Sequence, residues 1–238
     1  MLSVFSSCRQ TKIQFVYSIN QDNLALECDS VLLSYTNKYT DSLNQLLNQI
    51  IANTDTSWLA ARPQSILTHW CADAALAQGI ALMPADSEKL PICGLLNNGG
   101  LRGSLPNDTI KLHHFYELMP FENKLCAIKL SPEKMRDLIG YIINKRGEPI
   151  AGMMLRHQNI ADGAYAVKIS DKIYNFDKPV WVITSDYLAN GGDNMTFFSN
   201  PIERINFNIT LREIFILYAK KQQLLNVNLN ERYIYVKP

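Results

Sequence analysis

The segment that decides the fold is residues 92–103, which read ICGLLNNGGLRG. Its first five residues form a continuous apolar run, which is typical of a strand buried on both faces. The run passes directly into two asparagines, two adjacent glycines and an arginine. Glycines let backbone N–H groups approach a ligand, and an arginine can hold a carboxylate or a phosphate in a bidentate manner. We therefore expect this loop to line a binding site at the end of a buried strand.

A second segment, residues 180–193, repeats this design with the letters VWVITSDYLANGGD. A β-branched apolar run predicts another buried strand, and Asn190-Gly191-Gly192-Asp193 follows it. An aspartate on such a turn can accept hydrogen bonds from two hydroxyls, as in a ribose diol. Neither glycine loop has the spacing of a dinucleotide fingerprint or the Lys-Ser/Thr of a P-loop. A tight turn without a ligand stays open as the alternative for both loops.

The rest of the chain alternates helical and strand patterns. Leu43, Leu46, Leu47, Ile50 and Ile51 carry the stripe of an amphipathic helix that begins at Thr40 or Asp41. Further helices are predicted at residues 65–77, ending before Gly79, from Ser131 to Gly147, and after the capping box Thr210–Glu213, with Ile214, Leu217 and Tyr218 buried. Strands are predicted within residues 13–37 (Val31–Tyr35 included), and at 125–130, 165–169 and 232–236.

These patterns predict an α+β fold in which helices flank a mixed sheet. We assign residues 13–238 to a single domain, and the sequence contains no internal repeat or low-complexity linker. The adjacent His113 and His114 are expected to point to opposite faces of a strand, which makes them a poor pair of metal ligands.

Composition narrows the class of function. The chain has 238 residues, 23 Lys+Arg against 22 Asp+Glu, and a net charge of +1. This balance argues against a nucleic-acid polymer as ligand, which would require a basic excess, but leaves room for a small anion. No run of about 18–20 apolar residues is present to span a bilayer. Cys71, Cys93 and Cys126 lie in apolar surroundings and are expected to be small core residues.

Residues 1–12 carry a separate signal. The segment MLSVFSSC ends like a bacterial lipoprotein signal, with apolar residues, two small residues and then Cys8. Two interpretations stay open. In one, residues 1–12 are the remnant of a longer signal and Cys8 is lipidated. In the other, they are an ordinary N-terminus.

Four motifs resemble, in order, the C-terminal domain of the 5′-nucleotidase family. They are residues 62–73 (RPQSILTHWCAD), 94–102 (GLLNNGGLR), 118–123 (LMPFEN) and 186–193 (DYLANGGD). In that family this domain binds the nucleoside part of the substrate. The resemblance implies seven substrate-binding residues. Phe121 and Tyr187 would clamp the base, Asn123 would bind its edge, Asp193 would accept from the ribose, and Arg62, Asn97 and Arg102 would face ribose or phosphate oxygens.

Catalysis in that family belongs to a preceding metallophosphatase domain with two metal ions. The four histidines, His69, His113, His114 and His157, stand in none of that domain's metal-binding motifs. We therefore expect this chain to carry no catalytic residue, cofactor or metal, and to act with a separately encoded metallophosphatase chain that holds two divalent metals. The resemblance and Cys8 together predict a cell-envelope or periplasmic location, and the interpretation in which Cys8 is lipidated adds a lipid anchor to the membrane.

Four departures from the family pattern bear on these expectations. Tyr187 stands at the second clamp position, which is commonly Phe, and still offers a ring for stacking. Glu122 stands where the clamp loop usually has glycine, Asn194 where a glycine usually follows the aspartate, and Thr68-His69 where Gly-Asn is usual. Two other functions stay open. One is an envelope protein that binds nucleosides and has no catalytic role, and the other is a remnant whose clamp no longer binds.

Overall fold

The computed structural model describes residues 30–158 and 165–237. The chain divides into two compact units, Met1–Asp41 and Ser42–Pro238. The first described element, helix α1 (Ser30–Leu47), contains residues 31–35, so the strand predicted for Val31–Tyr35 is wrong. The apolar spacing of three to four residues that we assigned from Leu43 onward continues through Tyr39 and Tyr35. The strands predicted over residues 13–28, and Cys8, lie outside the described residues.

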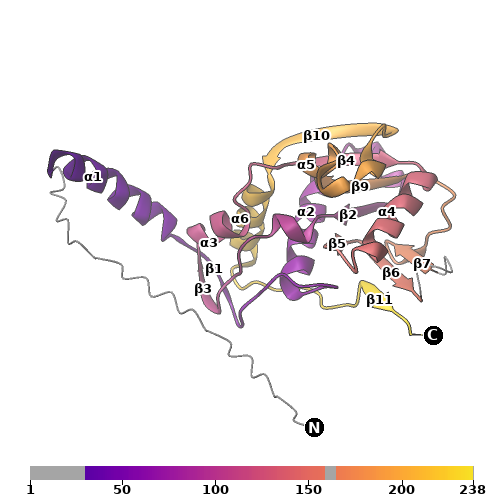
Figure 1. The fold of residues 1–238 in the computed structure, drawn as a ribbon, viewed down its shortest axis with the longest axis horizontal. Coiled ribbons are helices and arrows are strands. Elements are labelled where there is room, and N and C mark those ends of the chain that lie inside the picture. Colours follow the sequence, from indigo (N-terminus) through magenta and orange to yellow (C-terminus); the bar gives the residue numbers. More distant parts are fainter. Residues whose placement is uncertain (1–29, 159–164, 238) are drawn as a thin grey trace, which may run out of the picture. The chain divides into compact units, whose positions relative to one another are not determined.

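A five-stranded mixed sheet forms the centre of the second unit (Figure 1), in the order β10-β4-β9-β2-β5. Its strands are β2 (Ile92–Leu95), β4 (Lys124–Leu130), β5 (Ile150–Ala151), β9 (Val180–Ser185) and β10 (Glu203–Thr210). β2 and β9 are parallel, with Gly94 opposite Ile183, whereas the other three pairings are antiparallel. This mixed sheet confirms the predicted fold class.

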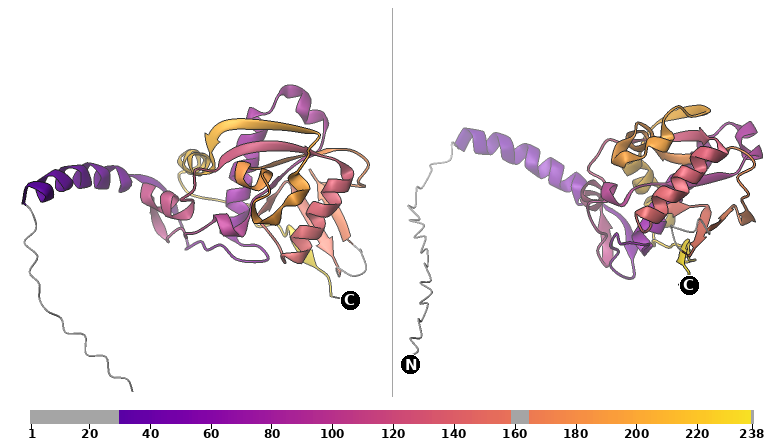
Figure 2. Two further views of the ribbon diagram at one scale, coloured as in Figure 1. Left: turned by 45° about the horizontal axis from the view of Figure 1, so that its top comes forward. Right: turned by 45° about the vertical axis from the view of Figure 1, so that its right-hand side comes forward.

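Alternate residues of the central strands pack into two hydrophobic cores. Leu125 and Ala127 of β4 pack with helices α2 (Ile66–Leu82) and α6 (Leu211–Gln222). Cys126 and Ile128 pack with helix α4 (Pro132–Asn144). Because successive strand residues point to opposite faces, the helices cover both faces of the sheet. The views in Figures 1 and 2 show α2 and α4 on opposite sides of the central strands.

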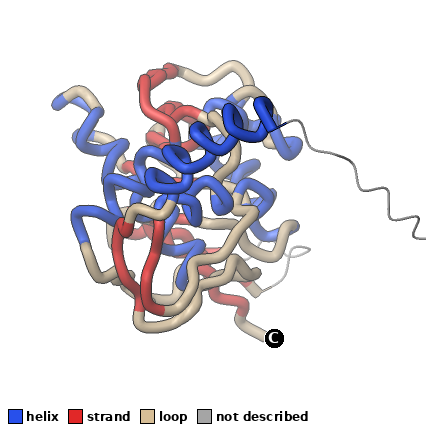
Figure 3. The backbone as a smooth tube through the Cα atoms, turned by 90° about the vertical axis from the view of Figure 1, so that its left-hand side faces the viewer, coloured by secondary structure: helices blue, strands red, loops and turns tan. Residues whose placement is uncertain are grey.

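Two smaller sheets complete the described fold. β1 (Ile50–Thr54) pairs antiparallel with β3 (Asp108–Lys111). The other sheet has the order β11-β6-β7-β8, from β11 (Tyr233–Tyr235), β6 (Met153–His157), β7 (Tyr165–Ile169) and β8 (Lys172–Ile173). Helices α3 (Leu112–Leu118) and α5 (Asp186–Ala189) are short. Helices and strands of the described residues contribute to one mixed architecture, in which helices and strands lie together (Figure 3).

Most of the predicted elements are present, and their caps explain where they begin. Ser131 caps α4 by accepting a hydrogen bond from Lys134 N, and Pro132 stands at its first position. Thr210 and Glu213 form the expected capping box of α6. The buried thiols of Cys71, Cys93 and Cys126 confirm the prediction of small core residues.

Four local expectations are corrected. The helix predicted to extend through Ile51 ends at Leu47, and Ile50 begins β1. Helix α2 does not stop before Gly79 but continues to Leu82, because the missing side chain of Gly79 lets the helix approach Ile183. A Cβ there would lie 2.6 Å from Ile183 Cγ2. Leu217 is 53% exposed, since α6 turns Ile214 and Phe215 to the core instead.

The fourth correction concerns His113 and His114, which lie in helix α3 and not on a strand. Leu112, Phe115 and Leu118 recur at helical spacing, and the last two are fully buried. The two imidazole centroids are only 4.0 Å apart, so the rings do not point to opposite faces. His114 Nδ1 accepts a hydrogen bond from Lys111 N at the helix start.

Candidate functional site

Three loops meet at one edge of the five-stranded sheet because of the directions of its strands. β2 and β9 are parallel, so the loops that follow them leave from the same edge. β4 runs antiparallel to β9, with Leu125 opposite Ser185, so the loop that precedes β4 reaches that edge as well. The three loops are those predicted to carry ligand-binding residues, and residues distant in sequence are therefore neighbours.

These loops enclose a pocket of about 190 Å³. Six of the seven residues that the resemblance implies for substrate binding line it, and Arg62 does not. The complete lining is Asn97, Gly99, Gly100, Arg102, Phe121, Asn123, Tyr187 and Asp193.

Asp193 is the centre of the polar network of this pocket. Its Oδ2 accepts a hydrogen bond from Asn97 Nδ2 at 2.5 Å, and its Oδ1 accepts one from the Tyr187 hydroxyl at 3.0 Å. The residue adopts a left-handed backbone conformation (φ 53°), and Gly191, two residues before it, has φ 91°. Each carboxylate oxygen keeps a second acceptor position, so Asp193 can still accept from ligand hydroxyls.

Two aromatic side chains stand at this pocket with part of their surface uncovered. Phe121 is 38% exposed and Tyr187 is 44% exposed. The Arg102 guanidinium carbon lies 5.5 Å from the centroid of the Phe121 ring, within the range of a cation–π contact. An aromatic ring that is neither buried nor fully solvated offers a surface on which a flat ligand can stack.

A single carboxylate, that of Asp186, ties the two aromatic loops together. Its Oδ1 accepts from Lys124 N at 3.0 Å and from Tyr187 N at 2.8 Å. Because one of these N–H groups follows the Phe121 loop and the other belongs to Tyr187, this bridge fixes the two loops relative to each other. Gly192 lets the chain turn beneath Tyr187, since a Cβ there would lie 2.5 Å from a carbon of the Tyr187 ring.

Arg62 stands behind the glycine loop and not in the pocket. Its Nη2 pairs with Glu148 Oε1 at 2.7 Å, and its Nη1 donates to the carbonyl oxygens of Lys145 and Gly147. The other oxygen of Glu148 accepts from Asn98 N at 2.8 Å and from Asn98 Nδ2 at 2.9 Å. Arg62 therefore supports the loop through Glu148, which is 4% exposed, instead of facing the pocket.

Sequence reasoning missed Glu148 and also Arg212. The buried Arg212 forms an ion pair with Glu122, donates to the carbonyl of Met119 at 3.1 Å, and stacks over the Tyr116 ring at 4.3 Å. Glu122, the departure from the family pattern, thus pairs with a cation of α6 that also holds the backbone of the Phe121 loop. The Thr210–Glu213 capping box predicts where α6 begins. It does not indicate that Arg212, the second residue of this helix, contacts the Phe121 loop.

Tyr141 of α4 is a further missed contributor. Its hydroxyl donates to the backbone carbonyl of Asp193 at 3.0 Å. Burial raises the pKa of Tyr141 to about 12, with Glu148 and Asp193 adding to the effect. The hydroxyl therefore stays protonated at neutral pH, and its hydrogen bond to the Asp193 carbonyl fixes the backbone of this turn.

No group of three or more His, Cys, Asp or Glu side chains suited to a metal ion occurs within residues 30–158 and 165–237. His69 is buried, and its Nε2 lies 3.2 Å from Gln64 Oε1. Burial lowers the pKa of His69 to about 4, with a smaller effect from Arg232. Of the described helices, none is long and apolar enough to cross a membrane.

With this geometry established, the comparisons with known proteins give the family. Residues 50–157 match the model described as 5′-nucleotidase, C-terminal domain. Over these residues, the chain is similar to the C-terminal domain of 5′-nucleotidases. The match includes the 62–73, 94–102 and 118–123 motifs, and the fourth motif lies beyond it. No curated protein sequence gives a significant match.

Solved structures with the same fold include a 5′-nucleotidase precursor from Thermus thermophilus (TM-score 0.70, 20% identity) and the NAD nucleotidase of Haemophilus influenzae (TM-score 0.64, 16% identity). A sulfate thiohydrolase from Thermus thermophilus also matches, with TM-score 0.61 and 10% identity. Each alignment covers 87–88% of this chain but only 39–44% of the other chain. The fold is thus shared by proteins named for different substrates. The function therefore has to be inferred from the residues of the pocket and not from the fold.

Proposed function

We propose that this 5′-nucleotidase C-terminal domain binds a nucleoside or nucleotide, with the base between Phe121 and Tyr187. The observation that carries the proposal is the convergence of six implied binding residues on one pocket of about 190 Å³. Stacking of a base on an aromatic side chain contributes roughly 1–3 kcal/mol and tolerates any base. The two half-exposed rings thus account for affinity, and the polar groups around them for orientation.

Asp193 would recognise the ribose, with its free acceptor positions receiving the two hydroxyls. Asn123, at the end of the Phe121 loop, would bind the edge of the base, and Arg102 would face ribose or phosphate oxygens. Because Asn97 and Tyr187 already hold the Asp193 carboxylate, its position is set before the ligand arrives. A preorganised acceptor costs little conformational entropy on binding.

The reaction would be phosphate-ester hydrolysis in nucleotide catabolism, catalysed by a separately encoded metallophosphatase that holds two divalent metals. This chain would contribute positioning only. The alternative is an envelope protein that binds nucleosides without a catalytic partner. Mixing the chain with a lone metallophosphatase and measuring AMP hydrolysis separates the two, because only the first function predicts a rate increase. Phosphatase activity of the chain alone that survives chelation would contradict both.

Binding itself is tested by calorimetric titration of the full chain with adenosine and with AMP. Replacing Phe121 by Ala should weaken adenosine binding about tenfold to a hundredfold, because one stacking surface is lost. Leu217→Ala truncates an exposed side chain on the outside of α6 and serves as the control, with unchanged affinity. If the wild-type chain binds neither compound, or if Phe121→Ala has no effect, the proposed base site is wrong.

We further propose that the protein lies in the cell envelope, anchored through a lipidated Cys8. The support is the resemblance of residues 1–8 to the end of a lipoprotein signal. Mass spectrometry of the native N-terminus tests this directly. A mature protein that begins with unmodified Met1 would exclude lipidation of Cys8.

A further inference from the structure

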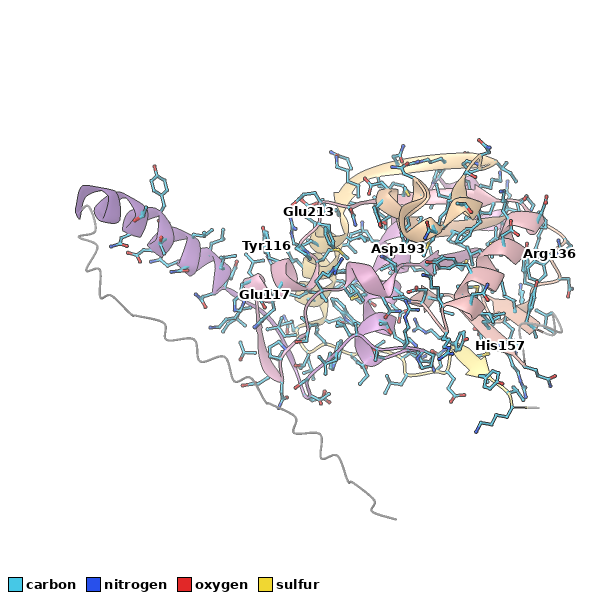
Figure 4. The ribbon with its side chains drawn as sticks, viewed as in Figure 1. Tyr116, Glu117, Arg136, His157, Asp193 and Glu213 are labelled. Carbon is cyan, nitrogen blue, oxygen red and sulfur yellow. The ribbon has the colours of Figure 1, made fainter. Side chains whose placement is uncertain are left out.

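A second cavity lies at the β11 end of the fold, away from the nucleoside pocket. Its volume is about 700 Å³, and it shares no lining residue with that pocket. Such a volume lies within the ~300–1,000 Å³ range of small-molecule sites. Figure 4 shows the labelled His157 beside β11, well apart from Asp193. The cavity is lined by Arg62, Pro63, Ile143, Arg146, His157, Tyr233 and Tyr235.

His157 is the unusual member of this cavity. The residue is 5% exposed, and neither Nδ1 nor Nε2 has a hydrogen-bond partner among the described residues. Burying a polar group without a partner costs roughly 1–3 kcal/mol, so such groups call for an explanation. Burial also lowers the pKa of His157, which favours the neutral imidazole with one donor and one acceptor nitrogen.

The strand pairing places two tyrosines against this imidazole. β11 runs parallel to β6, with Tyr235 opposite His157 and Tyr233 opposite Leu155. The ring centroid of His157 lies 4.9 Å from that of Tyr233 and 5.3 Å from that of Tyr235. Together with Ile143 and Pro63, these rings give the cavity flat, apolar walls, which favour a ligand with a flat apolar body.

The charge at the cavity is positive. The guanidinium groups of Arg62 and Arg146 line it, and no carboxylate is among the lining residues. Arg62 is already occupied by Glu148 and two carbonyl oxygens. The guanidinium of Arg146 has no hydrogen bond or ion pair within the part of the chain that the structure describes. It is therefore available for an anionic group, which an arginine can bind in a bidentate manner.

We propose that this cavity is a second ligand site, for a small organic anion with an aromatic body. The ring system would pack against Tyr233 and Tyr235, the anionic group would pair with Arg146, and the imidazole of His157 would gain the hydrogen-bond partner that it lacks. The proposal is independent of the nucleoside site, since the two pockets have no residue in common.

Calorimetric titration of the full chain with 2-naphthoate tests the proposal, with the uncharged 2-naphthamide as the matched control. Wild type should bind the carboxylate at least about tenfold more tightly than the amide, because only the carboxylate can pair with the guanidinium. Arg146→Gln should remove this difference. Arg136→Gln, which removes an arginine of helix α4 (Figure 4) that does not line this cavity, should leave it unchanged.

A second measurement addresses His157 directly. Long-range ¹H–¹⁵N spectra of the labelled imidazole should shift on addition of 2-naphthoate. His157→Phe should raise the unfolding midpoint, because it removes unpaired buried nitrogens, and should at the same time weaken binding of the probe. Loss of stability in His157→Phe would count against an unsatisfied imidazole and therefore against a ligand role.

The proposal is overturned if 2-naphthoate does not bind up to its solubility limit, or if the carboxylate and the amide bind equally. It is also overturned if affinity falls in Arg102→Gln and not in Arg146→Gln, since the probe would then occupy the nucleoside pocket.

Discussion

The nucleoside pocket and the β11 cavity differ in how their polar groups are satisfied. In the pocket, both oxygens of the Asp193 carboxylate accept hydrogen bonds, and Arg212 and Glu148 support the surrounding loops with ion pairs. In the β11 cavity, both nitrogens of His157 and the guanidinium of Arg146 have no such partners in the described part of the chain.

This difference separates two ways of presenting polar groups to a ligand. A network satisfied within the protein holds its acceptors rigidly, so a ligand meets a fixed geometry and the fold depends on the network. Groups without partners destabilise the fold and gain their hydrogen bonds only when something binds. Substitutions should therefore destabilise the protein around the nucleoside pocket and stabilise it, or leave it unchanged, at His157.

The largest effect is expected for Glu148→Ala. This change removes the acceptor for Asn98 N and Nδ2 and leaves Arg62 without its carboxylate. Removing this buried acceptor leaves the Asn98 donors unsatisfied and should lower the free energy of unfolding by about 2–3 kcal/mol, measured by urea denaturation. Glu148→Gln, which keeps the shape and one acceptor, should cost less. If both variants are as stable as wild type, the satisfied network does not support the loop.

Asp193→Asn tests the acceptor role within the pocket. The variant keeps the size of the side chain, but one carboxylate oxygen becomes an NH₂ group that must face Asn97 Nδ2 or the Tyr187 hydroxyl. Adenosine affinity should fall about tenfold or more, since hydrogen bonds to a charged acceptor contribute roughly 1.5–3 kcal/mol. Titration with 2′,3′-dideoxyadenosine provides the control. That ligand lacks both hydroxyls and should bind wild type and variant with similar affinity.

The smallest effect at neutral pH, which grows only on acidification, is a pH dependence of stability through His69, which supports β11 indirectly. Gln64 Oε1 faces His69 Nε2 and also accepts from Arg232 N and Tyr233 N at the start of that strand. The pKa of His69 is about 4 in the folded protein against 6.5 for the free group. The unfolded chain therefore binds more protons between these values, and stability should fall as the pH drops from about 7 towards 4.

The slope from one such group is at most about 1.4 kcal/mol per pH unit. Chemical denaturation at several pH values measures it, and His69→Gln should reduce the slope. Some slope should remain, because burial lowers the pKa of His157 in the same direction. An identical slope in wild type and His69→Gln would mean that His69 titrates alike in the folded and unfolded chains.

Much of the central fold followed from local patterns. The continuous apolar runs at residues 92–96 and 180–184 predicted β2 and β9, and Ser131-Pro132 predicted the start of α4, because burial on both faces and helix capping leave direct marks in the sequence. The errors arose where local signals were short. His113 and His114 belong to the short helix α3, whose few residues give only a weak helical pattern. The prediction that α2 ends before Gly79 failed because this glycine packs against Ile183 inside the helix.

The candidate site was likewise predicted where it depends on local motifs and missed where it depends on contacts between distant residues. Six of the implied binding residues belong to recognisable loop motifs, and the structure brings these six to one pocket. Arg62, the first residue of the 62–73 motif, lies behind it and pairs with Glu148. Glu148, Arg212 and Tyr141 were missed because each acts on a loop distant in sequence: Glu148 reaches Asn98, Arg212 reaches Glu122, and Tyr141 reaches Asp193.

The sequence by itself determined the type of elements, the glycine-rich loops that follow β2 and β9, and the family motifs, because these depend on neighbouring residues. Only the tertiary structure decided which loops share an edge, which carboxylates are already paired, and which polar groups stay without a partner. Those properties follow from strand direction and from contacts between residues far apart in the chain, and no local spacing encodes them. The imidazole of His157 is the plainest case, since it has no partner among the described residues and that depends on all the segments that pack around it.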